Sequence, residues 1–171
     1  QVDSVSFRLR AGEILGVAGL QGSGNSELFW GLFGAFGQRA SGSVVFAGER
    51  LDVRAPQECI RKGLALLTND RKATGLVLSM PVVANITLAS IGRHSPWGWR
   101  SSLSERESAE SAARAVRLRA ASLGMETAHL SGGNQQKGAL AKWMETRPRL
   151  LLMDAPTAAW MSEPSSRCTS S

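Results

Sequence analysis

A glycine-rich segment near the start of the chain has the residue types and spacing of a phosphate-binding loop. Residues 19–26 read Gly-Leu-Gln-Gly-Ser-Gly-Asn-Ser, which fits the pattern G-x-x-x-x-G-K-[ST] except that Asn25 replaces the lysine. Glycines let the backbone bend so that successive N–H groups point at phosphate oxygens, and the following helix N-terminus favours anions. Ser26 stands where a hydroxyl would bind Mg²⁺. Without the lysine, this segment alone leaves phosphate binding and a plain tight turn both open.

A second segment, residues 130–137, is more specific and reads Leu-Ser-Gly-Gly-Asn-Gln-Gln-Lys. The Ser131 hydroxyl and the N–H groups of Gly132 and Gly133, at a helix start, would form a nest for an anion. The segment resembles the signature of ABC-type ATPases, in the form with an inserted Asn that is typical of sugar-import ATPases. In that family the nest closes over the γ-phosphate of ATP held by a partner domain. The alternative is a Ser-Gly-Gly helix cap without a ligand.

Three more stretches occur in the order and spacing of this family. Residues 150–154, Leu-Leu-Leu-Met-Asp, resemble the Walker B strand, whose Asp holds Mg²⁺ through water. Residues 69–72, Asn-Asp-Arg-Lys, resemble the Glu-Asp-Arg-Lys segment at the Q-loop position of second sugar-ATPase domains. Residues 12–14, Gly-Glu-Ile, and residues 18–20, Ala-Gly-Leu, match the stretch that enters the phosphate loop. The resemblance covers residues 5–157 and implies the fold of an ABC ATPase.

The resemblance also implies ATP and Mg²⁺ as ligands. The residues that it assigns to the nucleotide are Gly19, Gly22, Ser23, Gly24, Asn25, Ser26, Glu27, Asn69, Ser131, Gly132, Gly133 and Gln135. It assigns Ser26 and Asp154 to the metal ion, and no residue to catalysis.

Several parts of the family's catalytic apparatus are missing from the sequence. The phosphate-loop lysine is Asn25, and the Glu that orients the attacking water is Ala155. The D-loop pattern is absent, the switch His would lie beyond the last residue, and the aromatic that stacks on adenine would precede Gln1. Phosphoryl transfer depends on positioning and charge neutralisation. We therefore expect no ATP hydrolysis by this chain alone.

Hydrophobic periodicity predicts the elements that position the first of these motifs. The alternation of residues 5–9 predicts a half-buried strand, and the apolar run 14–18 predicts a strand buried on both faces. A helix follows the glycine-rich loop and ends near Gly34. Strands at 43–47 and 51–53, joined by a turn at 48–50, form a hairpin.

The rest of the chain predicts a helical insertion between two buried strands. A helix at 55–62 closed by Gly63 leads to a strand at 64–67, and a later strand lies at 150–153. Between them we expect a helix at 81–91, a loop at 92–102, a helix capped by Ser104 and Glu107, and a helix from the signature to Thr146. The fold class is α/β: a P-loop NTPase core of the ABC type with a helical subdomain at about 79–146, lacking the C-terminal strands. Residues 1–157 form one incomplete nucleotide-binding domain.

Composition limits the remaining possibilities. The formal charge is +6, from 20 Lys and Arg against 14 Asp and Glu, but the basic residues are scattered. Two cysteines give no disulfide framework, and His94 and His129 have no further ligand at metal spacing. The most apolar stretch, 76–92, is too short and polar to span a bilayer.

We infer a degenerate, non-hydrolysing half of a carbohydrate importer. Its partners would be a second ABC ATPase domain, membrane permease subunits and, indirectly, a sugar-binding protein, at the cytoplasmic face of the inner membrane. Alternatives are an inactive fragment of such a subunit and a nucleoside importer. An ABC ATPase of DNA repair would need long heptads, which residues 82–128 lack, so no nucleic acid partner is expected.

Residues 158–171 differ from the family's continuation. The family has Arg-Gly-Val-Asp-Val-Gly-Ala-Lys where this chain has Ala-Ala-Trp-Met-Ser-Glu-Pro-Ser. Deleting one base from codons for the family segment yields this tail. We therefore expect an out-of-frame, unstructured tail, and exposed apolar surface where further strands of the family's sheet would pack.

Overall fold

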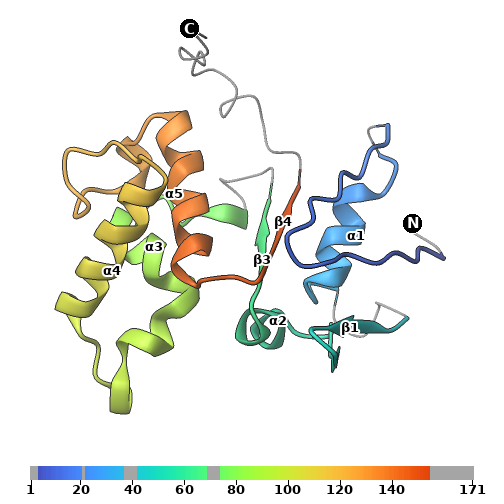
Figure 1. Cartoon of the computed structure of the whole chain (residues 1–171). Helices are drawn as coiled ribbons and strands as arrows, with labels where there is room; N and C mark the ends of the chain where they lie inside the picture. The colour runs from blue at the N-terminus through green and yellow to red at the C-terminus, as the bar shows by residue number, and fades with distance from the viewer. Residues whose placement is uncertain (1–3, 21, 37–41, 69–73, 155–171) are drawn as a thin grey trace, which may run out of the picture.

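The computed structural model describes residues 4–20, 22–36, 42–68 and 74–154 (Figure 1). The helices and strands follow one another in this order: α1 (Asn25–Leu32), β1 (Val44–Phe46), β2 (Glu49–Leu51), α2 (Pro56–Lys62), β3 (Leu64–Leu67), α3 (Val82–Thr87), the 3₁₀ helices η3 (Leu88–His94) and η4 (Pro96–Gly98), α4 (Ser102–Ala115), the 3₁₀ helix η5 (Thr127–His129), α5 (Gly132–Glu145) and β4 (Leu150–Met153). This alternation of strands and helices confirms the predicted α/β class, and the proposed tail at 158–171 lies outside the described residues.

The central sheet is a parallel pair made by β3 and β4, with Leu64 opposite Leu150 and Leu67 opposite Met153. Every residue of β3 is buried, as expected for a strand whose two faces are both covered. Parallel strands require a crossover connection, and here the crossover contains α3, α4 and α5. The two strands predicted at 64–67 and 150–153 are confirmed.

A small antiparallel hairpin, β1 with β2, precedes the central strands. Its loop is the two residues Ala47 and Gly48, which both have positive φ, 54° and 86°. Positive φ at both loop residues is the type I′ geometry that matches the twist of two-residue hairpins. The predicted turn at 48–50 was therefore too late by one residue, and β2 begins at Glu49.

Helices α3, α4 and α5 form a subdomain with a core of its own. Its buried apolar side chains are mostly small, which lets the helices approach closely: Val82, Ile86, Ala109, Ala112, Ala113, Leu130 and Ala141. The predicted helix at 81–91 changes after Thr87 into η3, which continues to His94 with a kink at Ser90. The predicted cap at Ser104 was wrong, since Oγ of Ser101 accepts from the Ser104 N–H and α4 begins at Ser102.

Helix α5 joins the two cores of the molecule. Its Ala139, Leu140 and Trp143 are buried in the cluster around β3 and β4, while Ala141 belongs to the helical subdomain. The Trp143 ring meets the ring of Phe33, after α1, edge to face at a centroid distance of 5.5 Å. A displacement of α5 would therefore disturb both cores.

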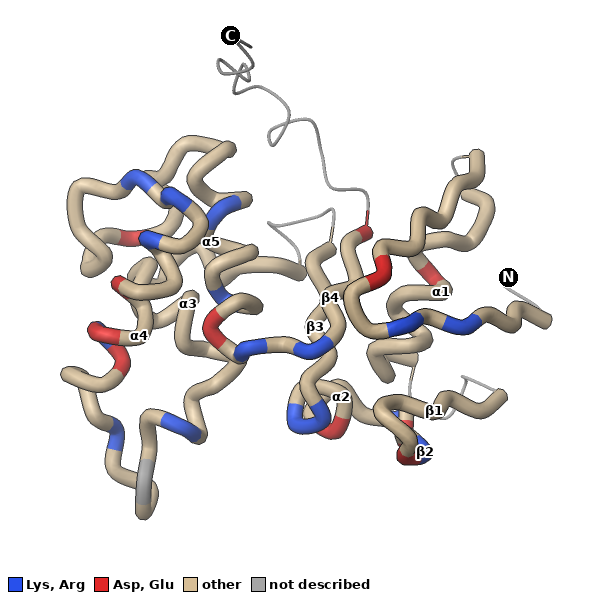
Figure 2. The backbone as a smooth tube through the Cα atoms, viewed as in Figure 1, with Lys and Arg blue, Asp and Glu red and all other residues tan. Residues whose placement is uncertain are grey.

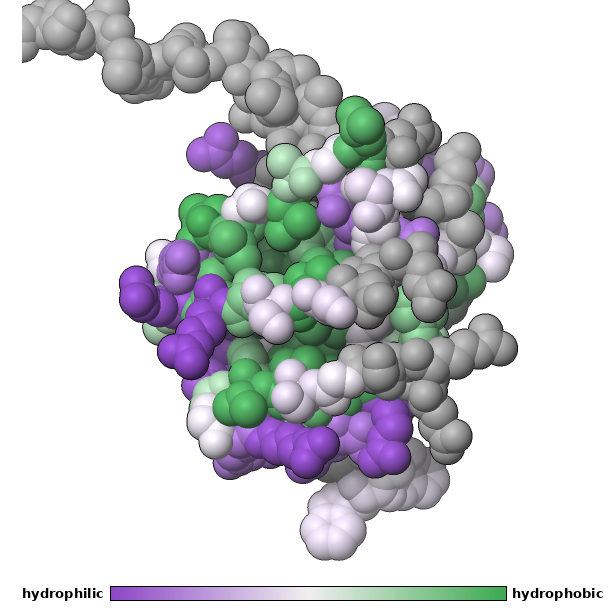
Figure 3. Space-filling model, turned by 90° about the vertical axis from the view of Figure 1, so that its right-hand side faces the viewer, coloured by the Kyte–Doolittle hydropathy of each residue, from purple (hydrophilic) through white to green (hydrophobic). Residues whose placement is uncertain are grey.

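The N-terminal segment, residues 5–20, does not form the two predicted strands. Within the described chain β3 and β4 pair only with each other, and neither is a hydrogen-bonded neighbour of this segment. Without such a neighbour its apolar side chains stay in solvent, and Ile14 is 98% exposed. Figure 3 views the side on which this segment and α1 lie and shows apolar side chains gathered there.

No helix among the described residues is long and apolar enough to cross a membrane.

Candidate functional site

The glycine-rich loop enters α1 through backbone conformations that favour glycine. Gly22 and Gly24 have φ of 82° and 95°, in the left-handed region that L side chains rarely adopt. The Ser23 N–H donates to the Leu20 carbonyl at 2.9 Å, which closes the turn. Gly24 caps α1, and no side chain accepts from the first N–H groups of that helix. These N–H groups are therefore available to an anionic ligand.

Asn25 lies against the start of the same loop. A Cβ placed on Gly19 would come within 2.3 Å of Ser23 Oγ and 3.0 Å of Asn25 Nδ2. A side chain at position 19 would therefore require the Ser23 hydroxyl to move. A neutral amide occupies the place where the phosphate-loop pattern has an ammonium group.

The loop meets the end of β4 through one hydrogen bond. Ser26 Oγ, in the first turn of α1, donates to Asp154 Oδ1 at 2.9 Å. Asp154 is buried. Its backbone N–H donates to the Leu67 carbonyl at 2.8 Å and so continues the pairing of β4 with β3. These are the two residues that the sequence assigns to Mg²⁺. Hydroxyl and carboxylate oxygens are suitable Mg²⁺ ligands, with waters filling the other positions.

The signature segment starts α5 and faces solvent. Ser131 caps the helix, since its Oγ accepts from the Asn134 N–H at 3.4 Å and from Asn134 Nδ2 at 3.1 Å. Ser131, Gly132 and Gly133 are all exposed, and a Cβ placed on Gly133 would meet open space. Asn134 Oδ1 in turn accepts from the Arg119 N–H at 2.9 Å, which braces the helix start against the preceding linker. The exposed hydroxyl and N–H groups form a surface that a ligand can approach.

Gln135 differs from its signature neighbours because its side chain is buried. Its Nε2 donates to the carbonyl oxygens of Leu130 at 3.1 Å and Thr127 at 3.4 Å. In this structure Gln135 therefore holds the turn before the helix, and its contact with a nucleotide stays a prediction.

The phosphate loop and the signature lie apart in this chain. Figure 1 shows α1 and α5 on either side of the β3–β4 pair. Within the described residues, no hydrogen bond joins Ser131, Gly132 or Gly133 to residues 19–26. The structure therefore does not join the two segments into one site within the described part of a single chain.

Asn69 lies outside the described residues, but both ends of its segment are placed. Thr68 follows β3 at the same sheet edge as Asp154, and its hydroxyl lies 2.8 Å from that of Thr74. Thr68 and Thr74, which border the segment of Asn69, are thus in contact with each other, and Thr68 lies at the sheet edge that carries Asp154.

Sequence reasoning missed a buried lysine on the signature helix. Lys142 donates to the Gly75 carbonyl and lies 4.9 Å from the centre of the Trp143 ring. Burial lowers the pKa of Lys142 to about 8, because the charged form loses its hydration. Gly75 closely follows the segment of Asn69, so this contact ties α5 to that segment. Helical periodicity gave no sign of it, because lysines usually lie on exposed faces.

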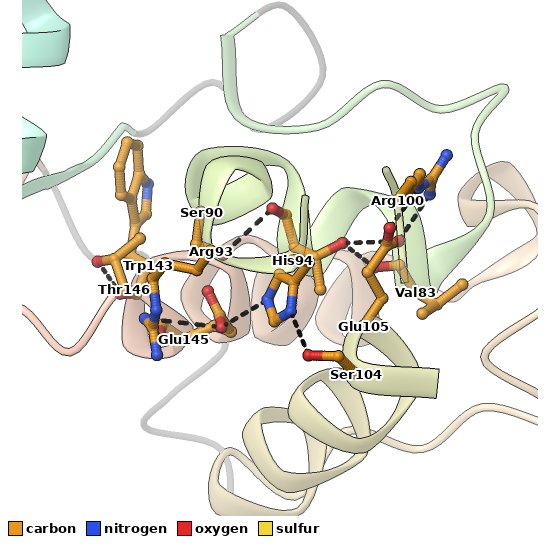
Figure 4. Close-up of polar contacts among 11 residues, drawn as sticks. Val83, Ser90, Arg93, His94, Arg100, Ser104, Glu105, Trp143, Glu145 and Thr146 are labelled. Atoms are coloured by element: carbon orange, nitrogen blue, oxygen red, sulfur yellow. Dashed lines mark hydrogen bonds and ion pairs between the residues drawn. The ribbon is translucent and has the colours of Figure 1, made fainter. Parts of the chain in front are cut away.

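Sequence reasoning also missed a buried polar network in the helical subdomain, shown in Figure 4. The ring of His94 lies between Ser104 Oγ, 2.9 Å from Nδ1, and Glu145 Oε1, 3.1 Å from Nε2. Arg93 donates to the Glu145 carbonyl at 2.9 Å. Oε2 of Glu145 is buried and, within the described chain, has no hydrogen-bond partner. The network therefore links η3, α4 and the last turn of α5.

A second buried carboxylate, Glu105, adjoins this network. Arg100 donates to it from Nε and from Nη2, the latter at 2.7 Å, and the Thr87 hydroxyl lies 3.5 Å from Oε2. The hydrogen bond from Arg100 is the main cause that holds the pKa of Glu105 below its usual value. No group of three or more His, Cys, Asp or Glu in the part of the chain described here is arranged to hold a metal ion.

Comparison with known proteins identifies relatives over almost the whole chain. A model of the ABC transporter family matches residues 2–158. A xylose import ATP-binding protein of Geobacillus kaustophilus (strain HTA426) is 42% identical over 156 residues, which are 91% of this chain and 31% of that protein. A putative ribose/galactose/methyl galactoside import ATP-binding protein of Ralstonia nicotianae (strain ATCC BAA-1114 / GMI1000) is 44% identical over 154 residues, 90% of this chain and 30% of that protein. The chain thus spans slightly less than a third of these relatives.

One solved structure supports the fold. The crystal structure of a nucleotide-free ATP-binding cassette from an ABC transporter superposes with a TM-score of 0.59 at 22% sequence identity. The match covers 80% of this chain and 55% of the other.

Proposed function

The chain belongs to the ABC transporter family of ATP-binding domains, and we propose that it binds ATP with Mg²⁺ in a carbohydrate importer without hydrolysing it. The relatives named for xylose import and for ribose/galactose/methyl galactoside import support a sugar as the transported substrate. The nucleotide ligands would be the phosphate loop of one domain and the signature of another.

The hydrogen bond between Ser26 and Asp154 carries this proposal. The two residues are 128 positions apart in the sequence, yet the fold brings the hydroxyl within 2.9 Å of the carboxylate. Mg²⁺ that bridges nucleotide phosphates is bound by one or two protein oxygens of this kind. The uncapped N–H groups at the start of α1 lie beside the pair and are suited to the phosphates.

The proposed loss of hydrolysis follows from residue types. Asn25 brings no positive charge to the phosphates, so charge that develops in the transition state is not neutralised there. Ala155 has no group with which to orient an attacking water. Neither Glu27, exposed on α1, nor Glu145, buried at the end of α5, lies in the motif position of the missing glutamate.

The proposed partner is a second ABC ATPase domain. The exposed signature at the start of α5 and the phosphate loop at the start of α1 each present half of a phosphate site and do not meet within one chain. Two domains together would complete the phosphate sites. The closure of the two domains on each other would be transmitted to the membrane permease subunits. The chain would then act as a peripheral component at the cytoplasmic face of the membrane, with a sugar-binding protein as an indirect partner.

Isothermal titration of the chain with ATP, in the presence and absence of Mg²⁺, tests the proposal. We expect Mg²⁺ to tighten binding, and Asp154→Asn and Ser26→Ala to remove most of that gain, because each substitution deletes a proposed ion ligand. Glu107→Gln, an exposed change on α4, is the control and should retain the gain. ATP binding that is indifferent to Mg²⁺, or unchanged in both site variants, would contradict the metal assignment. Phosphate release by the chain alone would contradict the lack of hydrolysis.

A further inference from the structure

The loop between η3 and α4, residues 95–101, presents two tryptophan side chains to solvent. Trp97 is 98% exposed and Trp99 is 83% exposed, and Leu103 at the start of α4 is 77% exposed. Figure 1 shows the loop projecting from the helical subdomain, away from the central strands. Large aromatic residues are usually half-buried or more in folded domains. Two exposed indoles on one projection therefore mark a candidate interaction surface.

The backbone holds Trp97 in an unfavourable conformation. Its φ of 58° and ψ of 21° lie in the left-handed region, where a bulky side chain is an outlier. The Gly98 N–H donates to the Ser95 carbonyl at 3.1 Å, which closes a tight turn around the indole-bearing residue. Strain of this kind persists where the surrounding structure enforces it and is found at functional positions.

The base of the loop is fixed by the buried network of Figure 4. The Ser101 N–H donates to the His94 carbonyl at 2.8 Å and so joins the two ends of the loop. The His94 ring is held between Ser104 and Glu145, and Arg100 is bound to the buried Glu105. The indoles therefore project from an ordered base, so binding through them loses less conformational entropy than binding through a free loop.

The charged residues within the loop are basic, and each is paired with a buried carboxylate from outside it. Between Asp70 and Glu105 the sequence contains no acidic residue, and the charged residues at 74–104 are Arg93 and Arg100. Their guanidinium groups are about half exposed, whereas Glu145 and Glu105, which they contact, are buried. Figure 2 shows basic positions, in blue, along the loop that projects from the helical subdomain. The exposed groups beside the indoles are thus guanidinium groups, whose inner sides are paired with Glu145 and Glu105.

We propose that this loop, residues 93–103, inserts its indoles into the interfacial region of a membrane that contains anionic lipids. Indole rings concentrate at the boundary between headgroups and hydrocarbon, where the ring is apolar and its N–H finds an acceptor. Guanidinium groups beside them attract anionic headgroups and bind phosphate. The contact goes beyond the proposed nucleotide function and does not depend on it, since the loop is far in sequence from the phosphate loop and the signature.

Co-sedimentation of the purified chain with lipid vesicles tests the proposal. Vesicles that contain phosphatidylglycerol are compared with vesicles of phosphatidylcholine alone, at low and high salt. We expect tighter binding to the anionic vesicles that weakens with salt. The double variant Trp97→Asn, Trp99→Ser should bind about tenfold more weakly or worse, because it removes most of the inserted apolar surface. Asn tolerates the left-handed conformation at position 97, so the fold should be kept.

The control variant Val45→Ser removes an exposed apolar side chain from β1, in the other part of the molecule, and should bind vesicles as the original chain does. Quenching of tryptophan fluorescence by brominated lipid should be lost in the double variant and kept in the control. Absence of binding to anionic vesicles, or equal binding by the double variant, would overturn the proposal. It would also fail if detergent-solubilised permease bound the loop in a tryptophan-dependent way while vesicles did not, since the occupant would then be a protein. The double variant keeps the residues of the proposed nucleotide site. ATP titration of this variant therefore tests the proposed nucleotide function separately from vesicle binding.

Discussion

Lys142 is a buried cation on the helix that carries the signature. Its ammonium group donates to the Gly75 carbonyl and faces the Trp143 ring, and no carboxylate is among the described contacts that it makes. Burial lowers its pKa from 10.5 to about 8. At pH values between these two pKa values, Lys142 binds more protons in the unfolded chain than in the folded chain. The free energy of unfolding should therefore rise with pH in this range.

We therefore expect the free energy of unfolding to gain about 2 kcal/mol from Lys142 between about pH 7 and about pH 10. The gain is absent below the folded pKa, where the lysine is charged in both states and the desolvation cost is fully present. Urea unfolding of the chain and of Lys142→Met at both pH values measures this contribution as a difference. The difference cancels titrations that both proteins share, including Cys59, whose pKa burial raises to about 11. If the free energy of unfolding changed with pH in the same way in both proteins, the contribution assigned to Lys142 would be contradicted.

Motif positions singled out residues that lie together in the fold, and their binding of Mg²⁺ stays a prediction. Ser26 and Asp154 were assigned to one metal ion from motif positions alone, and the fold places them within hydrogen-bond distance. Lys142, His94 and Glu145 belong to no motif, and their types normally indicate exposed positions. Their burial depends on how α5 packs between two cores, which no local spacing encodes.

Elements of the chain were predictable where a local signal defined both ends. Gly63, with φ of 96°, ends α2 as a glycine C-cap should, and α5 begins at the signature as predicted. The strand predicted at 14–18 failed because a strand exists only with a neighbour, and apolar composition does not supply one. Three serines at 101, 102 and 104 offered competing caps for α4, and Ser104 contacts His94 instead.

The contact between His94 and Glu145 should couple η3 to the last turn of α5. Both side chains are buried and lie 3.1 Å apart, so removing either deprives the other of a partner in a poorly hydrated site and leaves His94 with Ser104 alone or Glu145 with Arg93 alone. We expect His94→Leu and Glu145→Leu each to lower the free energy of unfolding by about 3 kcal/mol. The double variant should lose less than the sum, because it buries no unpaired polar group. Urea unfolding of the four proteins measures the coupling.

The exposed ion pair of Arg106 and Glu110 on α4, at 3.1 Å, is the matched control for this cycle. The corresponding variants with Ala at these positions should change stability by no more than about 0.5 kcal/mol. Additive losses for the His94 and Glu145 variants would show that the two side chains stabilise their elements independently.

The described part of the chain has two cores and one large apolar face that no described residue covers. The core around β3 and β4 and the core of the helical subdomain meet along α5, so they should unfold together. The uncovered face belongs to the N-terminal segment, whose exposed apolar side chains are Val5, Phe7, Leu9, Ile14, Leu15, Val17 and Leu20. Such a contiguous patch beside a two-stranded sheet with open edges favours association between chains.

We therefore expect the chain to self-associate as its concentration rises, and more strongly in sulfate, which strengthens apolar burial. The double variant Ile14→Lys, Val17→Lys should move the onset of association to a concentration about tenfold higher or more, because a charge in each contact opposes burial. Trp97→Asn with Trp99→Ser removes comparable apolar surface from the opposite end of the molecule and serves as the control. Size-exclusion chromatography with light scattering distinguishes the three proteins. If the original chain stays monomeric over the whole concentration range, the N-terminal face does not drive association. If instead the tryptophan variant alone is monomeric, the loop at 95–101 is the self-associating surface.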